Sequence, residues 1–447
     1  MHDCYLSVQL HKWYYAVGNS QLGLDPATRG LLVPILAILF GIYKFYIHNV
    51  IVLHFGIGRT IQPLEDFPNY SCQRIQHPLL GSCEDLWLDS FGRKLYAACS
   101  SPAKRKAWSP GGNVYDLAAR TAAGGGTDYI TVLDVDKPGP DGLYGARALN
   151  FRGKDGDVEE LDLHGFDVRV IDGNRLRFWL INHRPPLDLL TGGQLLDASN
   201  VGANSTIEVY DLDIRRGGDS NYLEHVKTIV SDAIISPNNL VALDDNDNSR
   251  GGFLLTNDHN TRAPGVLRKL TPILGGGSIS YCRTDTGQCH ITSSDKYTLP
   301  NGITRDPSSG LIYVAQSGKG VVTVHSLTAD NRLVQIDEIP MSMGVDNVSI
   351  DTKGNIFVGA FPNSIQLLKA FKDPYRTGAP STVLMIRKKT ADHDAPAEKA
   401  AYEVIKVVED AEAKVLPTTT TAVHDPISGR LFLGGVTSPF MAVCERQ

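Results

Sequence analysis

The chain has 447 residues, of which 42% are apolar, so it can bury the core of one large domain or of two to three ordinary ones and is not globally disordered. Its formal net charge is -6, from 43 basic and 49 acidic residues, and it contains no long basic run, so a nucleic-acid partner is not expected. The 43 glycines are typical of a protein built mostly from hairpins.

The first apolar stretch follows about thirty polar residues (1–30) that have no clear pattern. Residues 31–43 are almost all apolar, and the apolar character resumes after Lys44 and extends to Ile57. The uninterrupted run is shorter than the ~20 residues that a transmembrane helix needs. Residues 31–57 are therefore predicted to be a signal anchor or the hydrophobic part of a signal peptide, with a buried soluble helix as the alternative. This prediction places the protein in the secretory pathway, either membrane-anchored or secreted.

From Asn69 to the C-terminus, short apolar runs are bounded by Gly, Pro, Asp and Asn, which is typical of β-strands. Residues 129–135, 176–181 and 206–212 are examples. Residues 69–447 are therefore predicted to form an all-β domain. Two stretches are expected to be insertions: residues 103–127, and residues 388–414, whose Ala, Glu and Lys content indicates a helix.

One phrase occurs four times in this domain: an Asp, a tight turn that ends in Gly, and an apolar strand that closes on small residues. The copies begin at Asp89, Asp306, Asp351 and Asp425. Five residues before them stand Glu84, Asn301, Asp346 and Thr420. The copies at 306 and 351 begin 45 residues apart, which is the length of a four-stranded blade. We therefore predict a six-bladed β-propeller, because two irregular β-sandwiches, the alternative, would leave the repeat unexplained.

Pairs of oxygen-bearing residues stand at the start of the repeated strand: Glu84-Asp85, Asn238-Asn239, Asn301-Gly302 and Asp346-Asn347. Each of these residues alone is more typical of a turn or a cap. Carboxylate and amide oxygens without sulfur are, however, the ligands that Ca²⁺ prefers. Four such pairs in one register predict a calcium site at the centre of the propeller.

Two histidines occupy comparable places at strand ends, His164 in Leu163-His-Gly-Phe and His183 in Ile181-Asn-His-Arg-Pro. Both could face the same mouth, and an imidazole can accept a proton from water at physiological pH. The chain has 13 histidines, so a structural role is the alternative for either one. No Gly-x-Ser-x-Gly motif is present, which leaves an α/β-hydrolase mechanism without its nucleophile.

The seven cysteines are too few for a disulfide scaffold and lack zinc-binding spacing. Cys72 precedes the first repeated phrase and Cys444 lies three residues from the end, so a bridge between them would join the two ends of a ring. Cys282 and Cys289 flank a predicted turn and could bridge a hairpin. Reduced, buried cysteines are the alternative.

Glycosylation sequons begin at Asn69 and Asn204. Asn347 begins a third sequon, but we assign it to the interior of the protein. The two accessible sequons agree with an oxidising, secretory compartment.

Several motifs occur in a fixed order along the chain: Gly81-Ser-Cys-Glu-Asp-Leu, Leu163-His-Gly-Phe, Asn182-His183, Pro237-Asn-Asn-Leu-Val-Ala-Leu, Thr256-Asn-Asp-His, Pro300-Asn-Gly-Ile, Val345-Asp-Asn-Val-Ser-Ile-Asp and Cys444-Glu. Together they resemble the serum paraoxonase/arylesterase family, whose members are six-bladed propeller lactonases. The resemblance runs from about Cys72 to Cys444.

This resemblance implies two calcium ions at the centre. The catalytic ion would be held by Glu84, Asn238, Asn301, Asp346 and Asn347. A deeper structural ion would be held by Asp85, Asn239 and the main-chain oxygen of Phe166. His164 would be the general base and His183 its orienting partner. The Cys72–Cys444 disulfide and the retained N-terminal hydrophobic segment also match the family.

The chain departs from the family pattern at three places. Asn239 stands where the family has Asp, which removes a charge from the deeper site. The family's Cys-His-Pro-Asn stretch is Ala360-Phe-Pro-Asn here, which removes a histidine from the pocket wall. The region between Leu243 and Phe253 is longer and more acidic than in the family.

The sequence therefore predicts a calcium-dependent hydrolase of lactones and aryl esters, membrane-tethered or secreted. Calcium would polarise the carbonyl of a small-molecule substrate, and His164, assisted by His183, would deprotonate the attacking water. Phe361 and Phe440 are expected at the mouth, where they would set substrate size. The alternatives are a gluconolactonase-like or strictosidine-synthase-like propeller enzyme, and a non-catalytic interaction propeller that calcium stabilises.

Overall fold

The computed structural model describes residues 26–43, 47, 50–153, 160–188, 191–195, 197–215, 221–243, 251–389 and 401–447. The chain divides into two compact units, residues 1–49 and 50–447. Most of the expected polar segment 1–30 lies outside the described residues. So do residues 244–250, the main part of the acidic stretch, and residues 390–400 of the second expected insertion.

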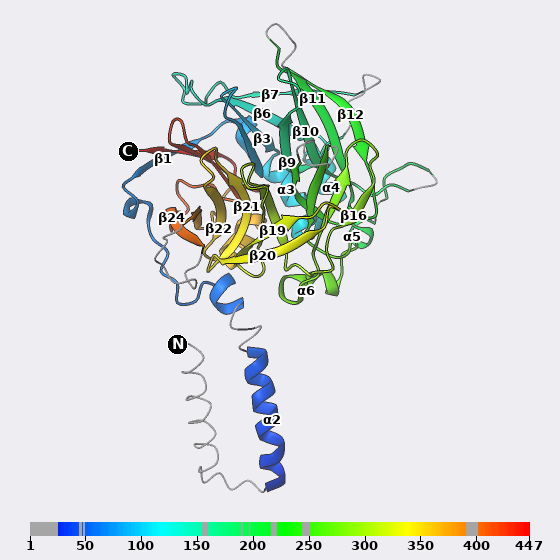
Figure 1. The fold of residues 1–447 in the computed structure, drawn as a ribbon, viewed down its shortest axis with the longest axis vertical. Helices are drawn as coiled ribbons and strands as arrows, with labels where there is room; N and C mark the ends of the chain where they lie inside the picture. Colours follow the sequence, from blue (N-terminus) through cyan, green and yellow to red (C-terminus); the bar gives the residue numbers. More distant parts are fainter. Residues whose placement is uncertain are drawn as a thin grey trace. The chain divides into compact units, whose positions relative to one another are not determined.

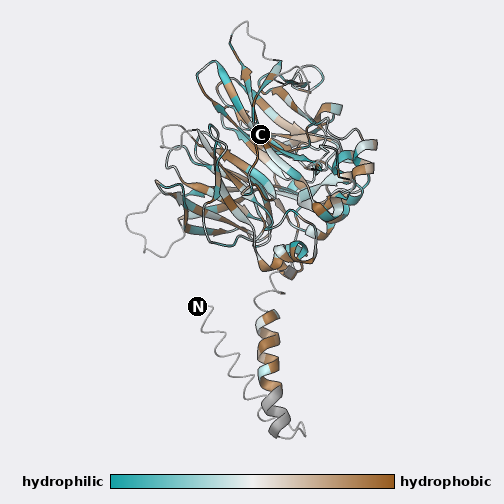
Figure 2. Ribbon diagram, turned by 90° about the vertical axis from the view of Figure 1, so that its right-hand side faces the viewer, coloured by the Kyte–Doolittle hydropathy of each residue, from teal (hydrophilic) through white to brown (hydrophobic). Residues whose placement is uncertain are grey.

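Two helices fall in the hydrophobic segment predicted at residues 31–57. Helix α2 (Pro26–Ile42) belongs to the first unit, and the part of it that Figure 2 colours is mostly hydrophobic. The π-helical turn η2 (Val50–His54) begins the second unit, where His54 Nε2 lies 3.0 Å from the carbonyl oxygen of Gly318. Within the described ranges, no helix combines the length and the hydrophobicity that crossing a membrane requires.

The second unit is the predicted six-bladed β-propeller (Figure 1). The innermost strands of its blades are β2 (Asp85–Asp89), β9 (Leu163–Val170), β13 (Pro237–Ala242), β17 (Pro300–Arg305), β21 (Gly344–Ile350) and β25 (Thr421–Asp425). Each of these strands contacts the next around the axis, and β25 contacts β2. The six innermost strands therefore form a closed ring.

The remaining strands extend each blade outwards in a regular order. Strand β2 is followed by β3 (Lys94–Cys99), β6 (Tyr129–Asp134) and β7 (Arg147–Ala148), and β9 by β10 (Arg175–Arg184), β11 (Asn204–Asp213), β12 (Tyr222–Ile229) and β8 (Asn150–Arg152). Strand β13 is followed by β14 (Gly252–Asn257), β15 (Ser278–Arg283) and β16 (Cys289–Ile291), and β17 by β18 (Ile312–Gln316), β19 (Val321–Leu327) and β20 (Leu333–Pro340). Strand β21 is followed by β22 (Ile356–Phe361), β23 (Ser381–Lys388) and β24 (Tyr402–Asp410), and β25 by β26 (Arg430–Gly434), β27 (Met441–Arg446) and β1 (Tyr70–Ile75).

One expected element is wrong. Residues 402–410, part of the stretch 388–414 that was expected to be helical, form strand β24. This strand pairs antiparallel with β23 along its length. Residues 402–410 form a strand because pairing with β23 outweighs local helix propensity, which is only a weak preference.

The helices of the propeller lie in the connections between the second and third strands of the blades. They are α3 (Pro102–Ala107) and α4 (Leu117–Ala122) in the first blade, α5 (Ala198–Val201), α6 (Val266–Leu274) and α7 (Ser364–Lys372). Because the strands of a blade alternate in direction, these connections lie at the end of the ring where the innermost strands begin. The helices therefore surround the end that carries the predicted ligands.

The repeated Asp of the sequence forms the turn after four of the six innermost strands, β2, β17, β21 and β25. Asp89 Oδ1, for example, accepts hydrogen bonds from the backbone N–H groups of Phe91 (3.1 Å) and Gly92 (2.8 Å). Asp425 also pairs with Arg93 of the first blade, across the junction of the first and last blades. The hydrophobic core lies between neighbouring blades, as in the cluster of Tyr96, Phe166 and Phe178 between the first two.

The last blade contains both ends of the propeller chain. Strand β1 pairs with β27, with Cys72 opposite Cys444, and the two cysteines form the predicted disulfide. The predicted Cys282–Cys289 bridge links β15 to β16. A third bridge, Cys83–Cys99, joins the start of the first blade to β3 and was not predicted from the sequence.

We predict that the Cys72→Ala/Cys444→Ala variant loses more stability than Cys282→Ala/Cys289→Ala. The first bridge closes a loop with a sequence separation of 372 residues and the second a loop of 7. Because a longer loop restrains the unfolded chain more, removal of the first should cost about 2–5 kcal/mol. Denaturant titration of both variants measures the difference. An equal loss in the two would show that ring closure depends on strand pairing alone.

Candidate active site

Three of the four predicted polar pairs lie in β-bulges at the start of the innermost strands, whereas Asp85 of the fourth pair faces Ala98 in regular register. Pairing with the second strand shifts between Pro237 and Leu240, between Pro300 and Ile303, and between Val345 and Val348. Strand β9 shifts in the same way at His164-Gly165. A bulge places two residues opposite one and changes the direction of a side chain. Bulges therefore coincide with three of the four polar pairs found in the sequence and with His164.

Glycines in two of these bulges let the innermost strands approach each other. A Cβ atom on Gly165 would lie 2.5 Å from the carbonyl oxygen of Asn238, and one on Gly302 would lie 2.5 Å from the Cα atom of Asn347. No side chain fits at such distances. The glycines that follow His164 and Asn301 are thus required by the packing around the axis.

Four side chains on the axis each keep one buried oxygen without a hydrogen-bond partner among the described residues. We call them the upper set: Glu84 Oε2, Asn238 Oδ1, Asn301 Oδ1 and Asp346 Oδ1. An unpaired buried acceptor costs about 1–3 kcal/mol, so four of them converging from four strands indicate a ligand. Two carboxylates and two amides are oxygen donors suited to calcium. The described part of the chain contains no cluster of three or more His, Cys, Asp or Glu side chains placed to hold a metal.

The two carboxyl groups of the upper set are electrostatically unfavourable as charged groups. Burial raises the pKa of Asp346 to about 8, and the charge of Asp85 adds to this effect. Burial, together with Asp85 and Asp346, also raises the pKa of Glu84 well above its ordinary value. A bound cation would stabilise both charged forms.

The residues predicted for the deeper ion, Asp85, Asn239 and Phe166, form a lower set with a different character. Asp85 Oδ2 accepts a hydrogen bond from the backbone N–H of Phe166 (3.2 Å), and Asp85 Oδ1 accepts one from Leu86 N–H (2.9 Å). Asn239 Oδ1 accepts from Leu240 N–H at 2.7 Å. Every side-chain oxygen of Asp85 and Asn239 thus has a partner.

Asn347 connects the two sets. Its Oδ1 accepts a hydrogen bond from Asn239 Nδ2 (2.6 Å), and its Nδ2 donates to Glu84 Oε1 (2.9 Å). The structure therefore brings all eight predicted ligands to the axis. Asn347 differs from the four residues of the upper set because its oxygen is already paired.

The two predicted histidines lie side by side at this end of the axis, with ring centroids 5.2 Å apart. His164 Nε2 is 3.8 Å from Glu84 Oε1, and His183 Nδ1 is 2.8 Å from Ser205 Oγ. Burial lowers the pKa of His183 to about 3. Burial, followed by the effects of His183 and Arg105, lowers the pKa of His164 well below its ordinary value. Both imidazoles are therefore neutral at physiological pH.

The connection between β3 and β6, which was expected to be an insertion, covers this end of the axis. The indole N–H of Trp108 donates a hydrogen bond to the carbonyl oxygen of His183 (2.7 Å). A Cβ atom on Gly111 would lie 3.2 Å from Asp258 Oδ2 and 4.0 Å from His164 Nε2. Gly111 thus covers the histidines so closely that a side chain there would enter the site.

Asp258 is a residue of the site to which the sequence assigned no role. Its Oδ1 lies 2.7 Å from His259 Nδ1 and also accepts a hydrogen bond from Ser236 Oγ. Its charge raises the pKa of His183, which opposes the effect of burial. The motif Thr256-Asn-Asp-His marked the position, but only the fold shows that it faces the histidines.

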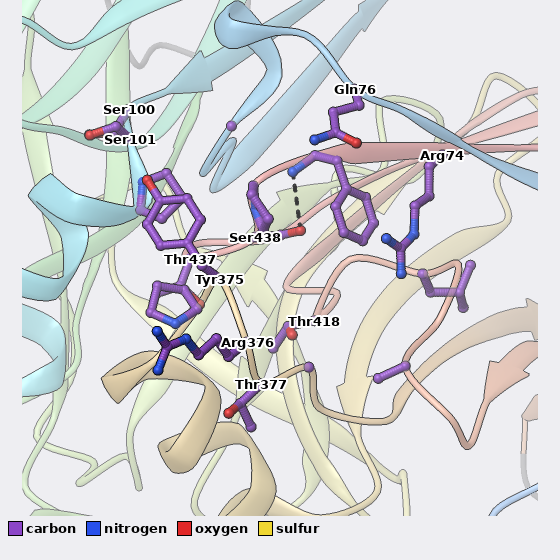
Figure 3. A pocket seen from close by; sticks show the side chains of 18 of the residues that line it. Arg74, Gln76, Ser100, Ser101, Tyr375, Arg376, Thr377, Thr418, Thr437 and Ser438 are labelled. Atoms are coloured by element: carbon purple, nitrogen blue, oxygen red, sulfur yellow. Dashed lines mark hydrogen bonds between the residues drawn. The ribbon is translucent and has the colours of Figure 1, made fainter.

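A cavity of about 620 Å³ lies beside α3, at the end of the ring where the predicted ligands stand. Figure 3 shows Arg74, Tyr375 and Thr418 among the residues that line it. Phe440, expected at the mouth, also lines this cavity. Phe361 instead packs under α7 with Leu367, Ala370 and Ala379.

The predicted glycosylation sites differ in accessibility. Asn69 is exposed and Asn204 is half-buried. Asn347, assigned to the interior from the sequence, is 1% exposed.

Comparison with known proteins identifies relatives of this chain. The sequence model of the Arylesterase family matches residues 195–435. Serum paraoxonase/arylesterase 2 of Canis lupus familiaris is 25% identical over 242 residues, which cover 53% of this chain and 58% of the relative. The protein of the same name from Gallus gallus is 25% identical over 281 residues, which cover 63% and 68%. The alignment thus spans little more than half the length of the canine relative.

Two solved structures resemble the fold. A putative gluconolactonase is 12% identical with a TM-score of 0.41, and the match covers 87% of this chain and 97% of that one. A luciferin-regenerating enzyme is 11% identical with a TM-score of 0.45, and the match covers 84% and 95%.

We predict that Gly302→Ala destabilises the propeller by about 1–3 kcal/mol, the usual cost of overpacking, because the added methyl group meets the backbone of β21. Gly193→Ala is the matched control, since a Cβ atom there makes only an ordinary contact with Thr191. Denaturant titration compares the two variants. Equal stabilities would contradict the packing described for the axis.

Proposed function

Because the chain belongs to the arylesterase family, we propose that it is a calcium-dependent hydrolase of lactones and aryl esters. The observation that supports this most directly is the upper set of four unpaired buried oxygens beside two neutral histidines. Unpaired acceptors suit a cation, and an unprotonated imidazole is the form that can accept a proton. The three disulfides agree with the proposed secretory route, in which residues 31–57 would tether the protein to a membrane.

The donor set fits calcium at the upper position. Glu84, Asn238, Asn301 and Asp346 would hold the ion, and it would supply Lewis-acid polarisation of a substrate carbonyl. Asn238, Asn301 and Asp346 lie on innermost strands of three blades and Glu84 directly precedes that of a fourth, so the ring itself would hold all four ligands in place.

His164 and His183 would act on the proton of the attacking water. His164 Nε2, beside Glu84, would accept a proton from the water that attacks the carbonyl carbon. His183, held by Ser205 at Nδ1, would orient His164 and share the charge that develops on it. The cover formed by Trp108 and Gly111 would exclude bulk water from these rings, which keeps both of them neutral before the reaction.

The lower set does not fit a second ion in the same way. The side-chain oxygens of Asp85 and Asn239 are paired, and the Asn239 amide donates to Asn347. We therefore propose one calcium ion, at the upper position, and assign no step to a second. The expectation of two ions rested on the family resemblance.

The number of ions can be counted directly. We predict one tightly bound calcium in the natural protein and two in Asn239→Asp, because the aspartate adds a charge beside Asp85 and cannot donate to Asn347. Atomic emission spectroscopy of dialysed protein gives the ratio of metal to protein. A ratio of two in the natural protein would contradict the single-ion proposal.

We further predict that purified protein hydrolyses aliphatic lactones or aryl esters with calcium and loses this activity in excess EGTA. Asp346→Asn should lose bound calcium and activity together, whereas His164→Gln should keep calcium and lose turnover by about 10²–10⁴-fold, the range for removal of a general base. Metal content and initial rates are measured on the same samples. Unchanged turnover in His164→Gln on several substrates would remove His164 as the base.

The non-catalytic alternative predicts a different pattern. A folded, calcium-loaded protein that hydrolyses none of the lactones and esters would support an interaction propeller in which calcium serves stability. Hydrolysis confined to sugar lactones would instead support the gluconolactonase-like alternative.

A further inference from the structure

Arg105 is a buried cation whose donors are not used. It lies on α3 and is 4% exposed, yet its Nε and Nη2 atoms have no hydrogen-bond partner within the described ranges. The nearest acid is Asp128, with Oδ2 at 4.0 Å from Arg105 Nη2. Asp128 already accepts hydrogen bonds from Lys104 Nζ (2.9 Å) and Leu163 N–H (3.0 Å).

The other fully buried arginines of the propeller are bonded in a different way. Arg120 donates to Asp162 and Glu160, and Arg268 donates to Asn113, Ser236 and main-chain oxygens. Such pairing is the rule, because a buried guanidinium without acceptors loses its hydrogen bonds to water and forms none with the protein. Arg105 departs from this rule at two of its nitrogen atoms, Nε and Nη2.

The position of Arg105 relates it to the catalytic centre. Asp128 holds the backbone of Leu163, the residue before His164. Burial sets the main pKa shifts of Glu84, His164 and His183; the charge of the guanidinium opposes the rise at Glu84 and adds to the fall at the two histidines. Arg105 is therefore linked to the catalytic centre through Asp128, which contacts both its guanidinium and the backbone of Leu163.

The cavity beside α3 has the same electrostatic character. Pro102, one turn before Arg105, lies on its wall, and so do Arg74 and Arg376 (Figure 3). The residues that the structure places on this wall include no Asp and no Glu. Hydroxyl groups of Ser100, Ser101 and several threonines complete its polar lining. This lining favours an anionic molecule over a cationic one, and Arg105 lies on the same helix as Pro102 but is not itself part of the wall.

We propose that Arg105 binds a carboxylate group of the substrate, so that the natural substrates are lactones or esters that carry a second, negatively charged group. A guanidinium offers a planar pair of N–H donors that matches the two oxygens of a carboxylate. This inference rests on the proposed function for the reaction, but binding of the anion can be tested separately. A phosphate offers related oxyanion chemistry and is distinguished in the test.

The first experiment measures equilibrium binding by calorimetry with the calcium-loaded protein. The probes are succinate, its neutral diamide succinamide, and inorganic phosphate. We expect succinate to bind at least tenfold more tightly than succinamide, and Arg105→Met to weaken succinate binding at least tenfold. Arg105→Lys, which keeps the charge but loses the planar pair, should lie between them. Lys106→Met removes an exposed charge from the same helix and should bind like the natural protein.

Two results of this experiment would overturn the proposal. One is succinate binding that is unchanged in Arg105→Met, with folding verified by thermal unfolding. The other is phosphate binding that is tighter than succinate binding and equally dependent on Arg105, which would replace the carboxylate with a phosphoryl group.

The second experiment measures hydrolysis of a matched pair of aryl esters, monophenyl succinate and phenyl succinamate, which differ in one charge. We expect the ratio of their kcat/KM values to favour the anion and to fall at least tenfold in Arg105→Met. Equal losses on both esters would show that Arg105 acts on the catalytic centre and not on the substrate charge. If neither ester is hydrolysed while succinate binding still depends on Arg105, the proposed function fails and the anion site stands.

Discussion

The convergence of six innermost strands on one axis is the constraint on which this structure depends. At the start of the strands the packing is so close that Gly165 and Gly302 have no room for a Cβ atom. The polar residues beside them are therefore held where neither water nor a backbone donor reaches every oxygen. Four unpaired acceptors at such a place are unfavourable unless a cation is bound. The bulges, the raised pKa values of Glu84 and Asp346, and the neutral histidines all follow from this burial.

The geometry of the axis in turn requires that the ring be closed. Strand β1 completes the last blade beside β27, and the Cys72–Cys444 disulfide fixes that pairing. Arg93 joins Asp425 at the opposite end of the innermost strands, across the junction of the first and last blades. Opening this junction would separate Glu84, in the first blade, from Thr420 in the last, where Thr420 Oγ1 now donates to the carbonyl oxygen of Glu84 (3.2 Å). The geometry of the site therefore depends on closure of the ring at a junction far from it.

The fold could be predicted from the sequence because the strongest pattern, the repeated Asp turn, depends only on neighbouring residues. An Asp that bonds its own turn recurs in four of the hairpins, so the repeat indicated the length of a blade and the phase of the ligands. The bulges depend on the register of a partner strand, so the sequence showed the polar pairs that three of them contain but not the bulges themselves. Cys83 and Cys99 meet only because the first hairpin forms, and β24 contradicts its own helical composition. The basic residues of α3 have the composition of a solvated surface, and only the fold shows that Arg105 is inside.

The contrast between the two sets of oxygens follows from the chemistry of a single side chain. An amide donates as well as accepts, so Asn239 satisfies Asn347 Oδ1 through its nitrogen and receives Leu240 N–H at its oxygen. A carboxylate at the same position could only accept. It would leave Asn347 Oδ1 without its donor and would place a second negative charge beside Asp85, whose pKa burial already raises to about 7. A site with those unpaired oxygens and charges would require a cation, whereas the amide supplies the missing donor from the protein itself.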